Sequence, residues 1–234
     1  VRPAGADPFF IHDMILAAPG DTALRSGDMA RIEQAVLAVW NGEAENDNFN
    51  LLTLAAGLGW DDVAVLRAFG HYLRQLGLSY SQRYLAATLA HHGAAAEALV
   101  ALFHALHDPR FTADRDAAAR MERQAIARAL EATGSIDEDR ILRRLLNVVE
   151  ASLRTSFYQR GPEGARRPAL AIKFDCHAIE GMVEPRPYRE IFVYSPRVEG
   201  LHLRFGPIAR GGIRWSDRPE DFRTEVLGLG KAQQ

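Results

Sequence analysis

The sequence of 234 residues contains very little cysteine and lysine, and it has no long apolar run. A single cysteine, Cys176, excludes both a disulfide framework and a four-cysteine zinc site, and it favours a reducing compartment, for which we expect the cytoplasm. No apolar stretch approaches the roughly 20 residues of a membrane-spanning helix, so we expect no membrane partner. The 28 basic and 30 acidic residues nearly cancel, and this balance argues against nucleic acid as a partner.

The positive charge is almost entirely arginine, because lysine occurs only at Lys173 and Lys231. The sequence is 47% hydrophobic and 25% charged, which is typical of a folded chain and excludes a disordered or fibrous one. Its length allows one large domain or two small ones.

Residues 1–160 divide into a predicted linker and a helical domain. Residues 1–27 are interrupted by proline and glycine, lack the pattern of a signal peptide, and are predicted to form a linker. Residues 28–160 carry apolar side chains at helical spacing, with Asp28 as the expected N-cap of the first helix. Helices are expected near 28–40, 49–58, 61–76, 94–106, 112–133 and 136–157, and a further one opens at 79–82.

Residues 161–234 show a different periodicity. Short β-branched and aromatic runs at 169–174, 190–194 and 201–205 alternate with a period of two and predict strands. A last helix is expected from Asp217, with Glu220 in capping-box spacing, through Leu229. The predicted fold class is α+β, mainly helical.

The segment that follows the third predicted strand concentrates the candidate binding residues. Gly211 and Gly212 are adjacent and would expose backbone N–H groups, and Arg210 and Arg214 flank them. Guanidinium groups match the plane of a carboxylate or phosphate, so an anion-binding site is one interpretation. An ordinary turn is the other, with the arginines paired to nearby carboxylates. The acidic candidates for that pairing are Glu220, Asp221 and Glu225.

Two nucleotide-binding patterns are excluded. Gly206 and Gly211 have the spacing of a phosphate-binding loop, but Gly212 and Ile213 replace its Lys and Ser/Thr. The Gly-Leu-Gly at 228–230 lies within a predicted helix and lacks the third glycine of a dinucleotide fingerprint.

The histidines and the cysteine give no reason to expect a metal site. His91 and His92, and His104 and His107, lie near predicted helix ends, where they are expected to face carbonyls or solvent; no nearby residue completes a tetrahedral set around His104 and His107. Cys176 is expected to be a small buried core thiol, since the adjacent His177 would point to the opposite face of a strand.

Three segments of the C-terminal part resemble the large bacterial NAD-dependent glutamate dehydrogenases: PYREIFVYSPRVEG at 187–200, ARGGIRWSDR at 209–218 and EDFRTEVLGL at 220–229. Residues 64–68, 72–77 and 153–156 resemble the segment upstream of that family's catalytic core. The resemblance runs from about residue 47 to the end. Since the family's chains are very long, this sequence resembles an internal fragment of one.

The resemblance implies oxidative deamination of L-glutamate to 2-oxoglutarate and ammonia, with NAD as cofactor. Smaller glutamate dehydrogenases hold the substrate carboxylate with a Pro-x-Lys-Gly-Gly-x-Arg loop. By this resemblance Arg210 takes the place of the lysine, Gly211 and Gly212 match the glycine pair, and Arg214 matches the closing arginine. These four residues are the predicted substrate-binding residues, and the residues 161–234 would be the start of the substrate-binding domain.

The same resemblance implies that the family's catalytic lysine and NAD-binding domain come after Gln234. We therefore expect no catalytic residue in this sequence, no activity from it alone, and a homo-oligomer for the longer enzyme. A second hypothesis stays open, in which residues 28–159 form a non-catalytic helical module for assembly or regulation.

Overall fold

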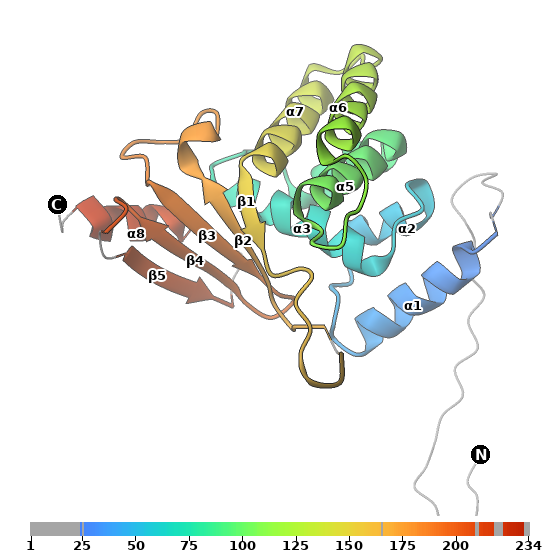
Figure 1. The fold of residues 1–234 in the computed structure, drawn as a ribbon, viewed down its shortest axis with the longest axis horizontal. Helices are drawn as coiled ribbons and strands as arrows, with labels where there is room; N and C mark the ends of the chain where they lie inside the picture. The colour runs from blue at the N-terminus through green and yellow to red at the C-terminus, as the bar shows by residue number, and fades with distance from the viewer. Residues whose placement is uncertain (1–23, 25, 165, 209–210, 218–221, 232–234) are drawn as a thin grey trace, which may run out of the picture.

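The computed structural model describes residues 24, 26–164, 166–208, 211–217 and 222–231. A bundle of helices lies beside an antiparallel sheet, and the last helix packs on the far part of that sheet (Figure 1). This arrangement confirms the predicted α+β, mainly helical class. The helical elements before the sheet are α1 (Asp28–Trp40), η1 (Asn48–Leu51), α2 (Leu52–Ala55), α3 (Trp60–Gln75), α4 (Gln82–His91), α5 (Gly93–His107), α6 (Arg115–Glu131) and α7 (Ile136–Glu150).

The helix boundaries follow the local capping chemistry. Ser81 begins α4 by accepting a hydrogen bond from the N–H of Tyr84, and Gly77 follows α3 with a left-handed φ of 82°. Asp28 is the first residue of α1 and not its N-cap, because the preceding Gly27, with φ of 89°, occupies that position.

Among the described residues, the sheet has five strands in the order β1-β2-β3-β4-β5, and every neighbouring pair is antiparallel. The strands are β1 (Ser152–Thr155), β2 (Leu170–Asp175), β3 (Arg189–Tyr194), β4 (Glu199–Arg204) and β5 (Gly211–Ser216); the short turns η2 (Pro162–Gly164) and η3 (Cys176–Ala178) flank β2, and α8 (Arg223–Lys231) follows β5. The prediction of one helix over 136–157 is wrong at its end: α7 stops at Glu150 and residues 152–155 pair with β2.

One face of the sheet packs against α3. Phe174 and Phe192 are fully buried on that face, and the ring of Tyr72 from α3 stacks on Phe174 with centroids 4.1 Å apart. The Tyr72 ring also lies 5.4 Å from that of Phe192. A continuous hydrophobic core therefore joins the helices to the sheet.

A buried polar network joins α3, the sheet and α8; we call its members Gln75, Glu190, Glu199 and Arg223 the junction network. Glu190 on β3 is 0% exposed and Arg223 at the start of α8 is 3% exposed. The Arg223 Nε donates to both carboxylate oxygens of Glu190, at 3.1 and 3.2 Å, and its Nη2 donates to Oε2 at 3.0 Å. This is a charge pair almost wholly removed from water.

Gln75, the last residue of α3, connects the two halves of the junction network. Its Oε1 accepts hydrogen bonds from the backbone N–H groups of Phe222 and Arg223, at 3.1 and 3.3 Å, and its Nε2 donates to Glu199 at 3.4 Å. The side chains of His71 and Arg74 also contact the Glu199 carboxylate, at 2.6 and 2.7 Å. Burial opposes ionisation of Glu199, but these partners outweigh it and hold its pKa below the ordinary value.

No single helix among the described residues is long and apolar enough to cross a membrane. Helices α4 and α5 together have the length and apolar composition of a membrane span, but the chain bends by 100° between them. Their apolar side chains, including Leu89, Leu99 and Phe103, are buried in the core.

We predict that replacing Arg223 by Met lowers the free energy of unfolding by about 3 kcal/mol or more, because the Glu190 carboxylate is left buried without a counter-charge. Changing Glu190 to Leu in the same chain is expected to restore most of that stability, since neither charge of the pair then remains. Urea denaturation measures both effects, with the exposed Arg128→Met as the control. A double variant as unstable as the single one contradicts this explanation.

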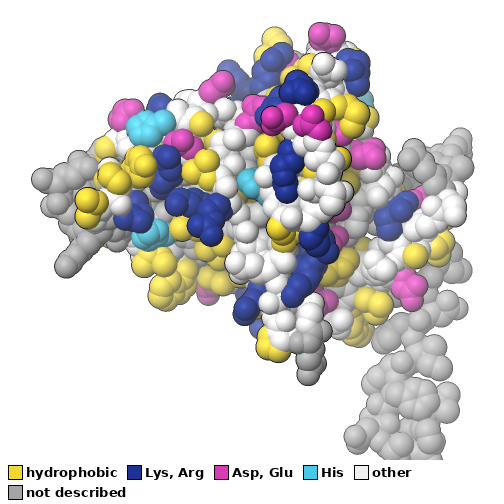
Figure 2. Space-filling view, viewed as in Figure 1, with side chains coloured by type: hydrophobic (Ala, Val, Ile, Leu, Met, Phe, Trp, Pro, Cys, Tyr) yellow, Lys and Arg dark blue, Asp and Glu magenta, His cyan; other side chains and the backbone are white. Residues whose placement is uncertain are grey.

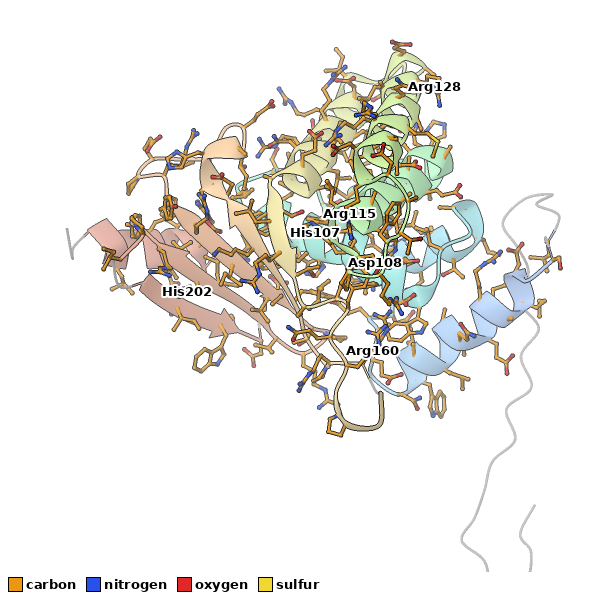
Figure 3. All side chains as sticks on the ribbon, viewed as in Figure 1. His107, Asp108, Arg115, Arg128, Arg160 and His202 are labelled. Atoms are coloured by element: carbon orange, nitrogen blue, oxygen red, sulfur yellow. The ribbon has the colours of Figure 1, made fainter. Side chains whose placement is uncertain are left out.

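A second prediction concerns His107, whose Nε2 lies 2.7 Å from the Ser152 Oγ. The Ser152 hydroxyl donates to the Val149 carbonyl, so it accepts from a neutral His107 that carries its proton on Nε2. Burial, together with the charge of nearby Arg115, lowers the pKa of His107 to about 4 (Figure 3). The unfolded chain, with an ordinary pKa near 6.5, binds the proton more readily.

The stability that His107 contributes is therefore complete above pH 6.5 and is lost as the pH falls toward 4. Between pH 7 and pH 5 the loss is expected to be about 2 kcal/mol. His107→Gln should remove that part of the pH dependence in urea denaturation, whereas the exposed His177→Gln should leave it in place. An unchanged pH dependence in His107→Gln would show that this histidine is not responsible.

Candidate functional site

The structure describes three of the four predicted substrate-binding residues, since Arg210 lies outside the described residues. Gly211 and Gly212 begin β5, which pairs with β4 from Arg204↔Gly211 to Glu199↔Ser216. The expected turn around the glycine pair is therefore a strand at residues 211–216. The strand was missed because two adjacent glycines favour a turn, although Ile213 and Trp215, both 68% exposed, alternate with polar residues.

Arg214 lies on the side of β5 that faces α8. Its Nη1 is 2.7 Å from Oε2 of Glu225, one of the carboxylates expected as a partner if the segment were an ordinary turn. Both side chains are about half exposed, at 45% and 52%. The guanidinium is therefore paired but reachable from solvent, a pair that typically contributes no more than about 1 kcal/mol and can exchange partners.

Gly212 has a packing role that the sequence did not indicate. A Cβ placed on it would lie 3.0 Å from Cγ1 of Val226 on α8, closer than side chains normally approach. The glycine therefore lets α8 lie directly against β5. This contact sets the distance between the helix that carries Glu225 and the strand that carries Arg214.

The N-terminus of α8 differs from its prediction. The helix begins at Arg223 and not near Asp217, and residues 218–221, including the expected capping residue Glu220, lie outside the described residues. The N–H groups of Phe222 and Arg223 are both bound by Gln75. These two donors are therefore not free to bind an anion.

The histidines contact side chains that the sequence did not identify. His104 joins Tyr158 at 2.7 Å and Asp62 at 2.9 Å. His91 and His92, expected to face carbonyls or solvent, both contact the Glu138 carboxylate, at 3.2 and 2.9 Å.

Within the described part of the chain, two clusters bring histidine and carboxylate groups close enough to hold a metal ion: His91, His92 and Glu138, and Glu45, Asp47 and His71. Hydrogen bonds already engage these groups: Glu138 binds the two histidines, Asp47 binds Arg67 and Glu45 binds Tyr194. A resident metal is therefore not needed to explain either cluster.

Cys176 is fully buried and free, as predicted. Burial raises the pKa of its thiol, with the neighbouring Glu190 carboxylate acting in the same direction. The thiol is thus kept protonated and is a poor nucleophile.

The described residues do not fit a dinucleotide. A Rossmann-type site needs parallel strands joined by a crossover helix, with a glycine-rich turn at the start of that helix. Every strand pair in the described sheet is antiparallel. No step that involves a nicotinamide cofactor can be assigned to these residues.

Two family models match the chain. Residues 125–234 match the catalytic domain of bacterial NAD-glutamate dehydrogenase, and residues 44–109 match helical motif 3 of glutamate dehydrogenase. The first match covers α7, the described sheet and α8, and the second covers η1 and α2 to α5.

Curated relatives agree with these matches. NAD-specific glutamate dehydrogenases are 49% identical over 226 residues in Mycobacterium tuberculosis, 44% over 229 residues in Halomonas elongata and 49% over 207 residues in Pseudomonas aeruginosa. These alignments cover 95%, 97% and 87% of the chain, but only 14%, 14% and 13% of the relatives. The chain, which spans about one seventh of the length of these relatives, belongs to the family of bacterial NAD-specific glutamate dehydrogenases.

Proposed function

We propose that this chain forms part of an enzyme that oxidatively deaminates L-glutamate to 2-oxoglutarate and ammonia, with NAD as the hydride acceptor. The observation that carries the proposal is the match of residues 125–234 to the catalytic domain, together with relatives named for this activity. The NAD-binding domain and the catalytic lysine belong to other parts of the enzyme in this proposal. The antiparallel sheet, which does not fit a dinucleotide, supports that division.

In this proposal Arg210, Gly211, Gly212 and Arg214 contact the substrate carboxylate. Support comes from Arg214, whose half-exposed guanidinium pairs with one carboxylate among the described residues, that of Glu225. A substrate carboxylate can replace Glu225 as the partner, and it can accept two N–H donors from the same guanidinium. The helical segment contributes indirectly. Gln75 at the end of α3 holds the start of α8, and α8 carries the Glu225 that positions Arg214.

The cellular setting is part of the same proposal. A reducing cytoplasm is supported by the one cysteine, which is free and buried. Assembly of the longer enzyme into a homo-oligomer is supported by two large apolar side chains that β5 exposes, Ile213 and Trp215.

The first prediction from this proposal is that activity requires the longer enzyme. The 234-residue chain should form no NADH from NAD and L-glutamate, whereas a chain extended to the length of the relatives should do so. Absorbance of NADH measures both, with D-glutamate as the control substrate. An extended, folded chain without activity contradicts the proposed function.

The second prediction concerns Arg214. In the longer enzyme Arg214→Gln should raise KM for L-glutamate by about tenfold or more and leave KM for NAD unchanged, because a charged hydrogen bond to the substrate carboxylate is lost. Steady-state kinetics measures both constants. Arg154→Gln, at an exposed arginine on β1 far from β5 in the strand order, is the matched control.

Glu225→Gln separates the substrate role from a structural one. It removes the ion pair but keeps the guanidinium, so KM for L-glutamate should change much less than in Arg214→Gln. Equal increases in the two variants would mean that Arg214 acts only through its pair with Glu225.

A further inference from the structure

A cavity of about 490 Å³ lies where the helical bundle meets the sheet. Its walls come from the turn after α1, the start of α3, the stretches 156–159 and 166–170, and the β3–β4 hairpin. Its volume is in the range of small-molecule sites. The strand register separates it from the glycine pair, because Tyr194 and Glu199 pair at the cavity end of the sheet whereas Arg204 and Gly211 pair at the opposite end.

One arginine of the cavity wall is fully engaged. The guanidinium carbon of Arg166 lies 4.6 Å from the centre of the Phe157 ring and 5.4 Å from that of Trp60, and the group also forms an ion pair with Asp61. These contacts hold Arg166 as part of the wall. The charges of Arg166 and Asp61 largely cancel each other.

Two other arginines line the same cavity without such partners. Arg167 and Arg197 are exposed, and neither guanidinium forms a hydrogen bond or an ion pair with any other residue that the structure describes. The Nη2 of Arg197 lies 3.7 Å from where a Cβ of Gly42 would be, so this side chain extends to the turn after α1. The two groups reach the cavity from separate segments.

We propose that this cavity binds a small oxyanion ligand, one that presents a phosphate or carboxylate group to Arg167 and Arg197. Planar guanidinium groups bind both kinds of oxyanion through paired N–H donors. Glu43 is the one acidic side chain of the lining besides the paired Asp61, and it is exposed. The unpaired positive charge therefore exceeds the negative charge in the wall. Because its walls come from both the bundle and the sheet, an occupied cavity links the two parts.

This site is independent of the proposed glutamate site, and it can be tested on the 234-residue chain without NAD or glutamate. Isothermal titration calorimetry at constant ionic strength measures binding of inorganic phosphate in one arm and malonate in the other. Saturable binding of one ion per chain is expected in at least one arm, and the arms show whether phosphate or carboxylate is preferred. No saturable binding in either arm overturns the proposal.

Variants locate the bound ion. Arg167→Gln and Arg197→Gln should each weaken binding by about tenfold, as expected for loss of a charge-assisted hydrogen bond. Arg128→Gln removes an exposed arginine from α6, far from the cavity, and should leave binding unchanged (Figure 3). Equal weakening in all three variants would show a general effect of net charge and overturn the site.

A conservative variant and a thermal unfolding measurement distinguish loss of binding from loss of folding. Arg197→Lys keeps the charge but loses the two-pronged geometry, so binding should be intermediate between the parent chain and Arg197→Gln. The thermal unfolding temperature of the parent chain should also rise with the concentration of the ion, and rise less in the folded Arg197→Gln chain. Binding of equal strength in the parent chain, Arg197→Lys and Arg197→Gln would exclude Arg197 from the site.

Discussion

The buried pair between Glu190 and Arg223 is the interaction on which the C-terminal half of the structure depends. Both side chains are removed from water, so each is tolerated only while the other is in place. Glu190 belongs to the centre of the sheet and Arg223 to the first turn of α8. The position of α8 is therefore fixed by a charge in the sheet as well as by apolar packing of Phe222 and Val226.

The junction network extends that constraint to the helical segment. Gln75 ends α3, binds the first N–H groups of α8 and donates to Glu199 on β4. Because α8 carries Glu225, the partner of Arg214, the geometry of the candidate substrate residue depends on a side chain far earlier in the sequence. A helical motif and a catalytic-domain segment that match separate family models thus share one polar core.

The surface of the sheet differs from this core. Figure 2 shows one face of the molecule, on which basic and apolar side chains gather over the sheet, away from the helical bundle.

The sequence predicted the elements that bury a regular apolar pattern and missed those that do not. The helices at α3 and α5 and the central strands β2, β3 and β4 were found because their core-facing side chains repeat at the period of the element. Strand β1 was read as the end of a helix, since its four residues show no alternation; Ser152 alone is buried. Strand β5 was missed because it begins with two adjacent glycines, which favour a turn.

For buried polar residues, the sequence predicts burial better than it predicts the partner. The period of β3 places Glu190 on the same face as Phe192 and Tyr194, so its burial could have been predicted from the strand alone. Its partner could not, because Arg223 is one of many arginines and the fold alone brings the two together. The contact of Gln75 with α8 has no sequence signal, since a glutamine near a helix end is ordinarily exposed.

The buried basic contacts of the structure explain why arginine stands where lysine could not. Arg67 is fully buried, with Nε and Nη2 each 2.8 Å from the Asp47 carboxylate and its guanidinium carbon 5.6 Å from the centre of the Phe49 ring. Arg223 binds Glu190 through two nitrogens, and Arg166 lies over two aromatic rings. Each contact uses the plane of the guanidinium and more than one N–H, which a lysine ammonium cannot reproduce. The buried positive charges of this fold, Arg67 and Arg223, are therefore arginine because burial requires several simultaneous partners.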